Sequence, residues 1–345
     1  MRRPLTAFLL LLFLAAQWIF GPLKPGENPA PSPTGWVKLA PEPTALVHSG
    51  GQWALVGQAR YYRLIPAQAT RTPSAASLRW EAIPEPSGAG VWHLLATAED
   101  IPLLGTGGLV YPNPFQPGVA LRDPATGQIF FGHPGGAVVP ATSTLRSPTG
   151  RVVWLPPGNA VAVVGTGPAG YGIWRLTAAE PARLLAPLAP GTHVLALGWD
   201  ASGALLWATD TGRVFWQGHG ALPLPPLTSV AIARGAAAVF GIDGHGRVVF
   251  WQPGHVQTRA LPALSFTGRP RFAPSGAGVA VVAETPKHQL VVLWDTPRQM
   301  HEVPLPDTPP VDYHLAGIWG PWVVVEALDG PHPGTYAYPI AGPHP

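Results

Sequence analysis

The sequence of 345 residues contains no cysteine. This absence excludes disulfide bonds, thiolate metal sites and a lipid-modified cysteine at the N-terminus. Charged residues are also scarce, at 11% of the chain against a usual share of about 25%. Lys and Arg outnumber Asp and Glu by only 21 to 18, and no basic run alternates with aromatics. We therefore expect no nucleic acid among the partners of this protein.

The sequence also lacks the spacings that mark most catalytic and metal sites. Its twelve His residues show none of the paired spacing that zinc sites or a His-Glu-x-x-His helix require. No Ser nucleophile elbow with His and Asp partners occurs. We accordingly assign no metal, no cofactor and no catalytic residue.

Glycine and proline, in contrast, are abundant, with 41 and 45 residues. Such a share alone would be typical of a disordered chain. A hydrophobic content of 46% and 14 Trp argue against disorder, because disordered chains have little apolar or aromatic material. The composition therefore favours an all-β fold with many turns.

Aromatic residues that close short apolar runs before a turn return along the chain. The intervals between them are 43, 45, 73 and 47 residues, and the longest is close to two shorter periods. Repetition at 40 to 45 residues is typical of a β-propeller, in which each repeat folds into one four-stranded blade. The residues of this series are Tyr111, Trp154, Trp199, Phe272 and Trp319.

Short apolar runs between Gly, Pro and Asp turns predict the strands of each blade. The clearest unit has strands at 271–273, 279–283, 290–294 and 302–305, and similar units begin near residues 109, 152, 194 and 229. A last unit at 313–340 offers three strands. Residues 45–105 form either one blade with an inserted hairpin or two poor blades. We therefore predict seven blades, or eight under the second interpretation.

Glycine precedes an aromatic residue by four positions in several predicted third strands. A glycine there supplies the positive φ that a tight hairpin turn needs, and the aromatic is expected to pack between blades. The pairs are Gly127 with Phe131, Gly170 with Trp174, Gly212 with Trp216 and Gly334 with Tyr338.

The N-terminal region differs from the repeats. Residues 4–23 are uncharged and follow Arg2 and Arg3, so residues 1–23 predict one hydrophobic helix, either a signal anchor or a cleaved signal peptide. Residues 24–35 form a Pro-rich linker. The propeller domain then covers 36–345, and we expect a strand at 36–39 to pair into the last blade, which would remove exposed sheet edges. The domain would be exported, and either anchored at the outer face of the cytoplasmic membrane or, if cleaved, secreted or periplasmic.

Several segments resemble known propeller repeats. FAPSGAGVAVVA (272–283), LGWDASGALLWATD (197–210), GRVVFW (246–251) and QLVVLWD (289–295) are similar to the repeats of WD-repeat and Tol-system-type propellers. This resemblance implies a propeller fold over about residues 108–340 and loops that contact protein partners. RDPATGQIFF (122–131) and ATDTGRVF (208–215) partly resemble motifs of quinone-dependent dehydrogenases and sialidases. Each occurs once, and turn chemistry explains both.

Charge recurs in the loops between second and third strands. In a propeller these loops share one rim, so this rim is the predicted binding surface. The equally simple interpretation is that hairpin tips are where polar residues must lie. The candidate binding residues are Arg122, Asp123, Asp210, Arg213, Asp243, His245, Arg247, Glu284, Lys287 and His288.

These observations lead to a hypothesis of function. The sequence favours a non-enzymatic, exported scaffold that binds another envelope protein or a polysaccharide and meets the membrane only through its N-terminal helix. The alternative is a carbohydrate-active hydrolase or lyase with its site at the central channel. Clustered carboxylates or several Arg residues at the channel would favour the enzyme.

Overall fold

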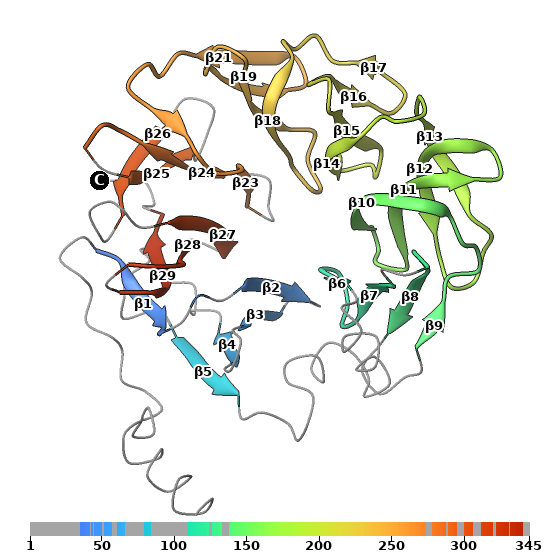
Figure 1. Ribbon diagram of the computed structural model, residues 1–345, viewed down its shortest axis with the longest axis horizontal. Helices are drawn as coiled ribbons and strands as arrows, with labels where there is room; N and C mark the ends of the chain where they lie inside the picture. Colours follow the sequence, from blue (N-terminus) through green and yellow to red (C-terminus); the bar gives the residue numbers. More distant parts are fainter. Residues whose placement is uncertain are drawn as a thin grey trace, which may run out of the picture.

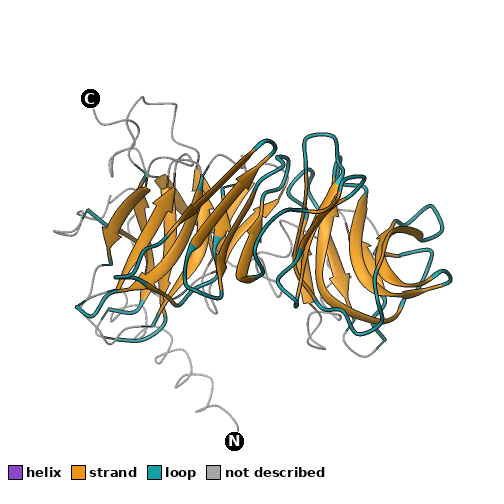
Figure 2. Cartoon of the chain, turned by 90° about the horizontal axis from the view of Figure 1, so that it is seen from above, coloured by secondary structure: helices purple, strands orange, loops and turns teal. Residues whose placement is uncertain are grey.

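The computed structural model describes the chain over 35–41, 43, 45–49, 52–56, 61–65, 79–83, 109–123, 126–132, 138–273, 278–287, 289–294, 300–305, 312–319, 322–330 and 332–340. The secondary structure in these ranges is β throughout, as expected (Figure 2). None of the described residues belongs to a helix that could cross a membrane. The helix predicted at 1–23 and nearly all of the linker precede the first described residue.

In the described ranges the strands form seven antiparallel sheets. The first four, each written from its first strand outward, are β2 (Ala45–Ser49), β3 (Gln52–Val56), β4 (Tyr61–Ile65) and β5 (Arg79–Ile83); β6 (Leu109–Pro112), β7 (Val119–Arg122), β8 (Ile129–Gly132) and β9 (Val139–Pro140); β10 (Arg146–Leu155), β11 (Ala160–Gly167), β12 (Gly170–Leu176) and β13 (Arg183–Pro187); and β14 (Val194–Trp199), β15 (Leu205–Thr209), β16 (Val214–Trp216) and β17 (Gly220–Ala221). The other three are β18 (Leu227–Ile232), β19 (Val239–Asp243), β20 (Val248–Gln252) and β21 (His255–Arg259); β22 (Ser265–Phe266) and β23 (Arg271–Phe272) beside β24 (Val279–Glu284), β25 (Gln289–Trp294) and β26 (Met300–Pro304); and β27 (Tyr313–Trp319), β28 (Trp322–Ala327), β29 (Gly334–Pro339) and β1 (Val37–Ala40).

The sheets stand in a ring, with the first strand of each nearest the central axis (Figure 1). Strand β2 contacts β6 on one side and β27 on the other, and similar contacts join β10 to β14, β14 to β18 and β23 to β27. Between the second and third sheets, the Trp154 indole N–H donates to the Tyr111 carbonyl oxygen over 2.8 Å. Four-stranded sheets arranged in this way are typical of propeller blades.

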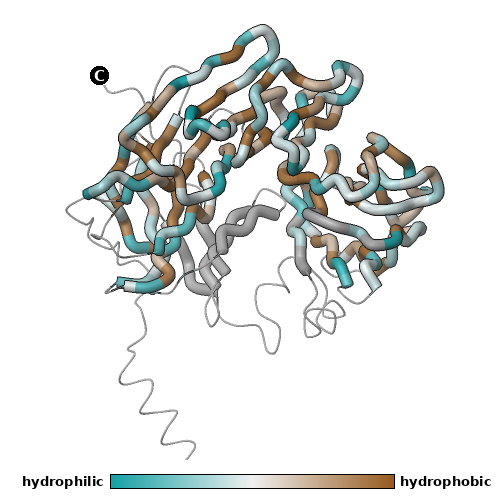
Figure 3. Tube along the Cα trace, turned by 45° about the horizontal axis from the view of Figure 1, so that its top comes forward, coloured by the Kyte–Doolittle hydropathy of each residue, from teal (hydrophilic) through white to brown (hydrophobic). Residues whose placement is uncertain are grey.

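The recurrent aromatics lie in the core between neighbouring sheets. Trp154, Trp199 and Trp319 are 3%, 2% and 5% exposed. Trp154 packs in one cluster with Phe131 of the preceding sheet and Trp174 of its own. The hydrophobic stretches follow the strands and the hydrophilic ones gather at turns (Figure 3). The prediction that these aromatics belong to the core is thus confirmed for the three tryptophans of the series.

The four glycines before the third-strand aromatics all have positive φ. The angles are 72°, 103°, 76° and 150° at Gly127, Gly170, Gly212 and Gly334. A residue with a Cβ rarely adopts this conformation. The glycine pattern in the sequence therefore marks true hairpin turns.

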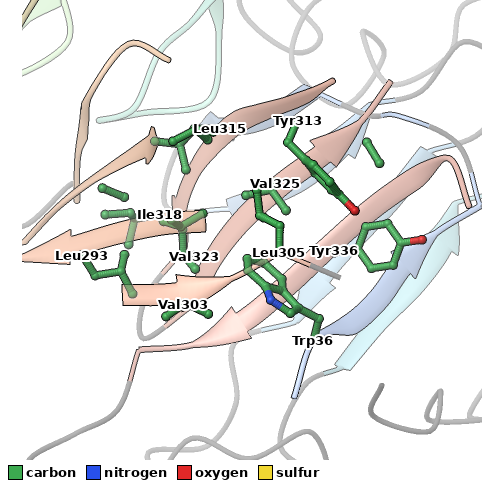
Figure 4. Packing of buried hydrophobic residues seen from close by; sticks show 14 residues of the cluster. Trp36, Leu293, Val303, Leu305, Tyr313, Leu315, Ile318, Val323, Val325 and Tyr336 are labelled. Atoms are coloured by element: carbon green, nitrogen blue, oxygen red, sulfur yellow. The ribbon is translucent and has the colours of Figure 1, made fainter. Parts of the chain in front are cut away.

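The N-terminal strand β1 completes the sheet of the C-terminal strands. Val37 and Lys38 pair with Ala337 and Tyr336 of β29. The Trp36 side chain is fully buried, and its indole N–H donates to the Pro304 carbonyl oxygen over 2.8 Å. Figure 4 shows Trp36 packed among side chains of the last two sheets. Burying this ring removes a large apolar area from water and holds the two ends of the chain together.

Two regions differ in detail from the sequence expectation. The described strands between residues 45 and 83 make a single sheet, and residues 84–105 of the segment expected to form one blade or two lie outside the described residues. The first strand expected at 271–273 is divided, because β22 and β23 both pair with β24. Pro270 stands between them and has no N–H to donate to the ladder, which accounts for the interruption.

Candidate functional site

The topology separates two sets of turns. The sheets share one strand order and radiate from the axis in the same sense, so equivalent turns gather on one face of the ring. We call the turns between second and third strands the rim turns, and those between first and second strands the axial turns. Antiparallel pairing places the two sets on opposite faces. The nine candidate residues that the structure describes belong to rim turns or to the strand ends beside them.

Three rim turns are closed in the same way. In each, a backbone N–H donates over 2.9 Å to the carbonyl oxygen of the residue directly before the third strand. A glycine with a φ of 72° to 76° directly precedes that residue. The turns are therefore rigid and place one side chain at an equivalent position in each sheet. The donor and acceptor pairs are Asp123 with Gln128, Thr209 with Arg213 and Asp243 with Arg247.

The carboxylate of Asp243 is used inside its own turn. Its Oδ1 accepts the backbone N–H groups of His245 and Arg247 over 2.9 Å each, and its Oδ2 accepts Arg247 Nε over 2.7 Å. Burial by itself would raise the pKa of Asp243, but the hydrogen bonds and charge of Arg247 and the bond from His245 outweigh it and lower the pKa. The Asp243 side chain is 2% exposed and that of Arg247 is 45% exposed. Arg247, rather than Asp243, is thus the group that this turn presents to solvent.

The first rim turn also engages its charged residues. Asp123 Oδ2 accepts the Thr126 hydroxyl over 2.6 Å, and the Asp123 carbonyl oxygen accepts the Gly127 N–H over 2.8 Å. The Arg122 guanidinium donates to the Pro148 carbonyl oxygen of the next sheet. These contacts hold the turn together, so both side chains have a structural role.

The other predicted residues lie on separate turns. Asp210 and Arg213 are exposed at the turn between β15 and β16. Glu284 Oε1 accepts the Gln289 side-chain amide over 2.8 Å, and Lys287 is exposed beyond it. His288 is not among the described residues. The structure thus joins Asp243, His245 and Arg247 by hydrogen bonds, and the other described candidates lie in three further rim turns.

Titratable groups also meet on the last sheet, near the axis. His314 of the innermost strand β27 pairs in register with Glu326 of β28, so their side chains share one face. His314 Nε2 lies 3.5 Å from Asp312 Oδ1. Burial raises the pKa of Glu326, and the charges of His314 and Arg271 oppose that rise without cancelling it. The sequence reading missed this group, because only the sheet register brings residues 314 and 326 together.

The axial turns hold a different kind of cluster. Asn113 is fully buried; its Nδ2 donates to the Gly158 carbonyl oxygen over 2.8 Å and its Oδ1 accepts the Phe115 N–H over 3.0 Å. Gln116 Nε2 donates to the same Gly158 oxygen over 2.6 Å. The turn between β6 and β7 is therefore hydrogen-bonded to the turn between β10 and β11.

This cluster continues onto two further sheets. The Phe115 ring lies 5.7 Å from the ring of Trp199, and the guanidinium carbon of Arg234 lies 5.9 Å from the same Trp199 ring. Trp199 and Arg234 form a parallel β-bridge, and the Gly235 N–H donates to the Trp199 carbonyl oxygen over 2.8 Å. Sequence reasoning missed Phe115, although an aromatic between two prolines in a turn is a signal that could have found it.

Asp200 closes the axial turn that follows Trp199. Its carboxylate accepts the Ser202 N–H and hydroxyl, the Ala204 N–H and, over 3.0 Å, the Trp216 indole N–H. Burial raises its pKa, and these hydrogen bonds, led by the Ser202 hydroxyl, lower it below the ordinary value overall. Asp200 is 8% exposed, so its charge is held within the turn.

Metal ligands do not gather in the described part of the chain, where no group of three or more His, Asp or Glu could hold an ion.

No protein-family model and no curated protein match the sequence. The structure is similar to solved propeller proteins at low sequence identity. A streptogramin B lyase is 12% identical, with 90% of this chain and 95% of that chain covered and a TM-score of 0.51. Virginiamycin B lyase from Staphylococcus aureus is 12% identical, with 88% and 97% covered and a TM-score of 0.52.

The structure of YCF48 bound to D1 peptide is 11% identical, with 91% of this chain and 99% of that chain covered and a TM-score of 0.50. Likeness at this identity carries the fold alone. The expected resemblance to β-propeller repeats is thus confirmed for the fold.

Proposed function

We propose that this chain is a seven-bladed propeller that serves as a binding scaffold at the cell envelope, with its rim turns as the contact surface. The hydrophobic stretch within residues 1–23 supports export, and the Pro-rich linker would hold the propeller away from the membrane. The partner we favour is another envelope protein. A propeller of similar fold, YCF48, has been solved with a bound peptide, which supports a protein partner over a polysaccharide.

The observation that carries this proposal is the equivalence of Arg213 and Arg247. Both are exposed, both follow a positive-φ glycine, and both stand directly before the third strand of adjacent sheets. Their backbones are fixed by the same hydrogen bond, so binding would require little ordering of the turns. A pair of preorganised guanidinium groups complements carboxylates on a partner surface.

Charge removal at the rim tests the proposal. We expect Arg213→Glu with Arg247→Gln to lose the partner that co-purifies with the membrane-extracted full chain. Gln at 247 keeps a donor within reach of the buried Asp243, so the turn should persist. A matched control, Arg183→Glu with Arg259→Gln, changes charge equally at exposed positions on the outermost strands. If the rim variant and the control retain the same partners, the rim is merely solvated.

A second candidate function follows from Glu326. A carboxyl group with a raised pKa beside His314 near the axis has the form of a general acid, which favours the hydrolase or lyase alternative. Incubation with soluble acidic and neutral polysaccharides, followed by detection of new reducing ends or unsaturated products, would test it. Product formed by the wild-type chain and lost in Glu326→Gln would support the enzyme, and no product from either would leave the scaffold.

A further inference from the structure

An aromatic side chain is displayed on the axial-turn face. Phe115 is 39% exposed, while its ring contacts the almost fully buried Trp199. A single exposed apolar residue is ordinary on a protein surface. Phe115 is unusual because buried polar groups fix it: Asn113 binds its N–H, and the same Asn113 is tied to the neighbouring turn through Gly158.

Close packing reinforces this fixation. A Cβ added at Gly158, where φ is 101°, would lie 2.9 Å from both Asn113 Oδ1 and Phe115 Cβ. Only glycine allows the two turns to approach this closely. Phe115 therefore has little conformational entropy left to lose when a ligand contacts it.

A cation is held over the same indole ring. The guanidinium carbon of the exposed Arg234 lies 5.9 Å from the Trp199 ring centroid. Arg234 comes from the next sheet, and a parallel β-bridge pairs its backbone with that of Trp199. Trp199 is 2% exposed and so forms a common base under both side chains. An aromatic and an arginine at a fixed separation are the residue types that dominate binding energy at protein interfaces.

The axial turns that the structure describes carry few charged residues. Their charged residues are Asp200 and Arg234; the Asp200 carboxylate accepts four hydrogen bonds within its turn and is 8% exposed. The turns beside Phe115 also carry the exposed Pro117, Pro156 and Pro157. A positive charge on an apolar face fits a ligand that carries a carboxylate next to an apolar group.

We propose that the axial turns form a second binding surface, opposite the rim turns, for an acidic peptide segment in which a carboxylate stands beside an aromatic or aliphatic side chain. Phe115 contacts the apolar side chain and Arg234 takes the carboxylate. The surface joins turns of four consecutive sheets, so it exists only when those sheets are packed side by side. It is independent of the rim turns and of any activity near the axis.

Selection from a random peptide library on the immobilised full chain tests this surface. We expect enriched peptides to carry Asp or Glu next to an aromatic or aliphatic residue. Synthetic copies, measured by fluorescence anisotropy, should bind Phe115→Ala and Arg234→Ala about tenfold or more weakly than the wild type. Phe115→Trp should retain binding, and Arg234→Lys should retain part of it, because the charge persists while the planar stacking is lost.

Matched controls separate this surface from the rest of the molecule. Val256→Ala and Arg259→Ala remove an exposed apolar and an exposed arginine side chain from β21 and should leave binding unchanged. The rim variant Arg213→Glu with Arg247→Gln should bind the selected peptides as the wild type does, which distinguishes this inference from the proposed function. The inference is overturned if no peptide is enriched, if the enriched peptides lack the acidic–apolar pattern, or if Phe115→Ala with Arg234→Ala binds them equally well.

Discussion

Replacing Asp243 by Ala should destabilise the propeller far more than the same change at Asp210. The substitution removes the carboxylate that accepts the backbone N–H groups of His245 and Arg247, and these donors then lose their partner within the turn. Each of these two hydrogen bonds contributes about 1 kcal/mol to the free energy of unfolding. The ion pair with Arg247 adds less than about 1 kcal/mol, because the Arg247 side chain is 45% exposed. The substitution should therefore lower the free energy of unfolding by about 2–3 kcal/mol. Asp210 stands at the adjacent rim turn but is exposed. Its removal should change stability by less than about 0.5 kcal/mol.

Thermal unfolding of the two variants at several pH values provides the assay. At neutral pH we expect Asp243→Ala to lower Tm by about 5 °C and Asp210→Ala to leave it nearly unchanged. The folded-state pKa of Asp243 is lowered, so its contribution is present above the unfolded value of about 4 and is lost as pH falls through the folded value. The difference between wild type and Asp243→Ala should therefore shrink in acid. Equal effects of the two substitutions at neutral pH, or a difference independent of pH, would refute the reasoning.

Two further pairs of substitutions probe the turns and the axis. Gly212 and Gly254 share a φ of 76°, but an added Cβ meets the Leu227 backbone N at 2.5 Å in the first and nothing within 4 Å in the second. We expect Gly254→Ala to cost about 1–2 kcal/mol and Gly212→Ala clearly more in denaturant unfolding; similar costs would mean that φ alone decides. The pKa of Glu326 is raised by burial, so its favourable contribution is present below its unfolded value and lost as pH rises through the folded one. Glu326→Gln should thus raise Tm at neutral pH and leave Tm unchanged near pH 4. The control Glu302→Gln, at an exposed position, should leave Tm unchanged at both pH values. A lower Tm of Glu326→Gln at neutral pH would contradict the expected direction.

Much of the fold followed from local pattern. The closing aromatics, the glycines four residues before the third-strand aromatics and the apolar runs between turns each report a backbone requirement that neighbours in sequence satisfy. The division of the strand into β22 and β23 was harder to predict from the sequence, because it depends on how the segment around Pro270 pairs with β24. The ring itself depends on contacts between strands distant in the chain, such as β2 with β27.

The candidate site was predicted as a set of positions but not as a set of roles. Asp210 and Asp243 occupy similar Asp–Gly turns in the sequence, yet the first is exposed and the second is bound by its own turn. The two turns have the same length, but Asp243 ends its second strand, as Thr209 does in the other turn, whereas Asp210 stands one residue later. The clusters around Phe115 and Glu326 were missed because their members come together only through sheet register and the packing of adjacent sheets.

The sequence by itself determined that this protein is built from short strands and tight turns, because strand length, glycine at positive φ and scarce charge are local properties of the chain. The tertiary structure decided which side chains face solvent and which act together. Packing of adjacent sheets brings the Asn113 turn against Gly158 and Trp199 against Arg234. Such pairs belong to different sheets, and the packing of those sheets side by side, with the hydrogen bonds between their turns, holds them in contact.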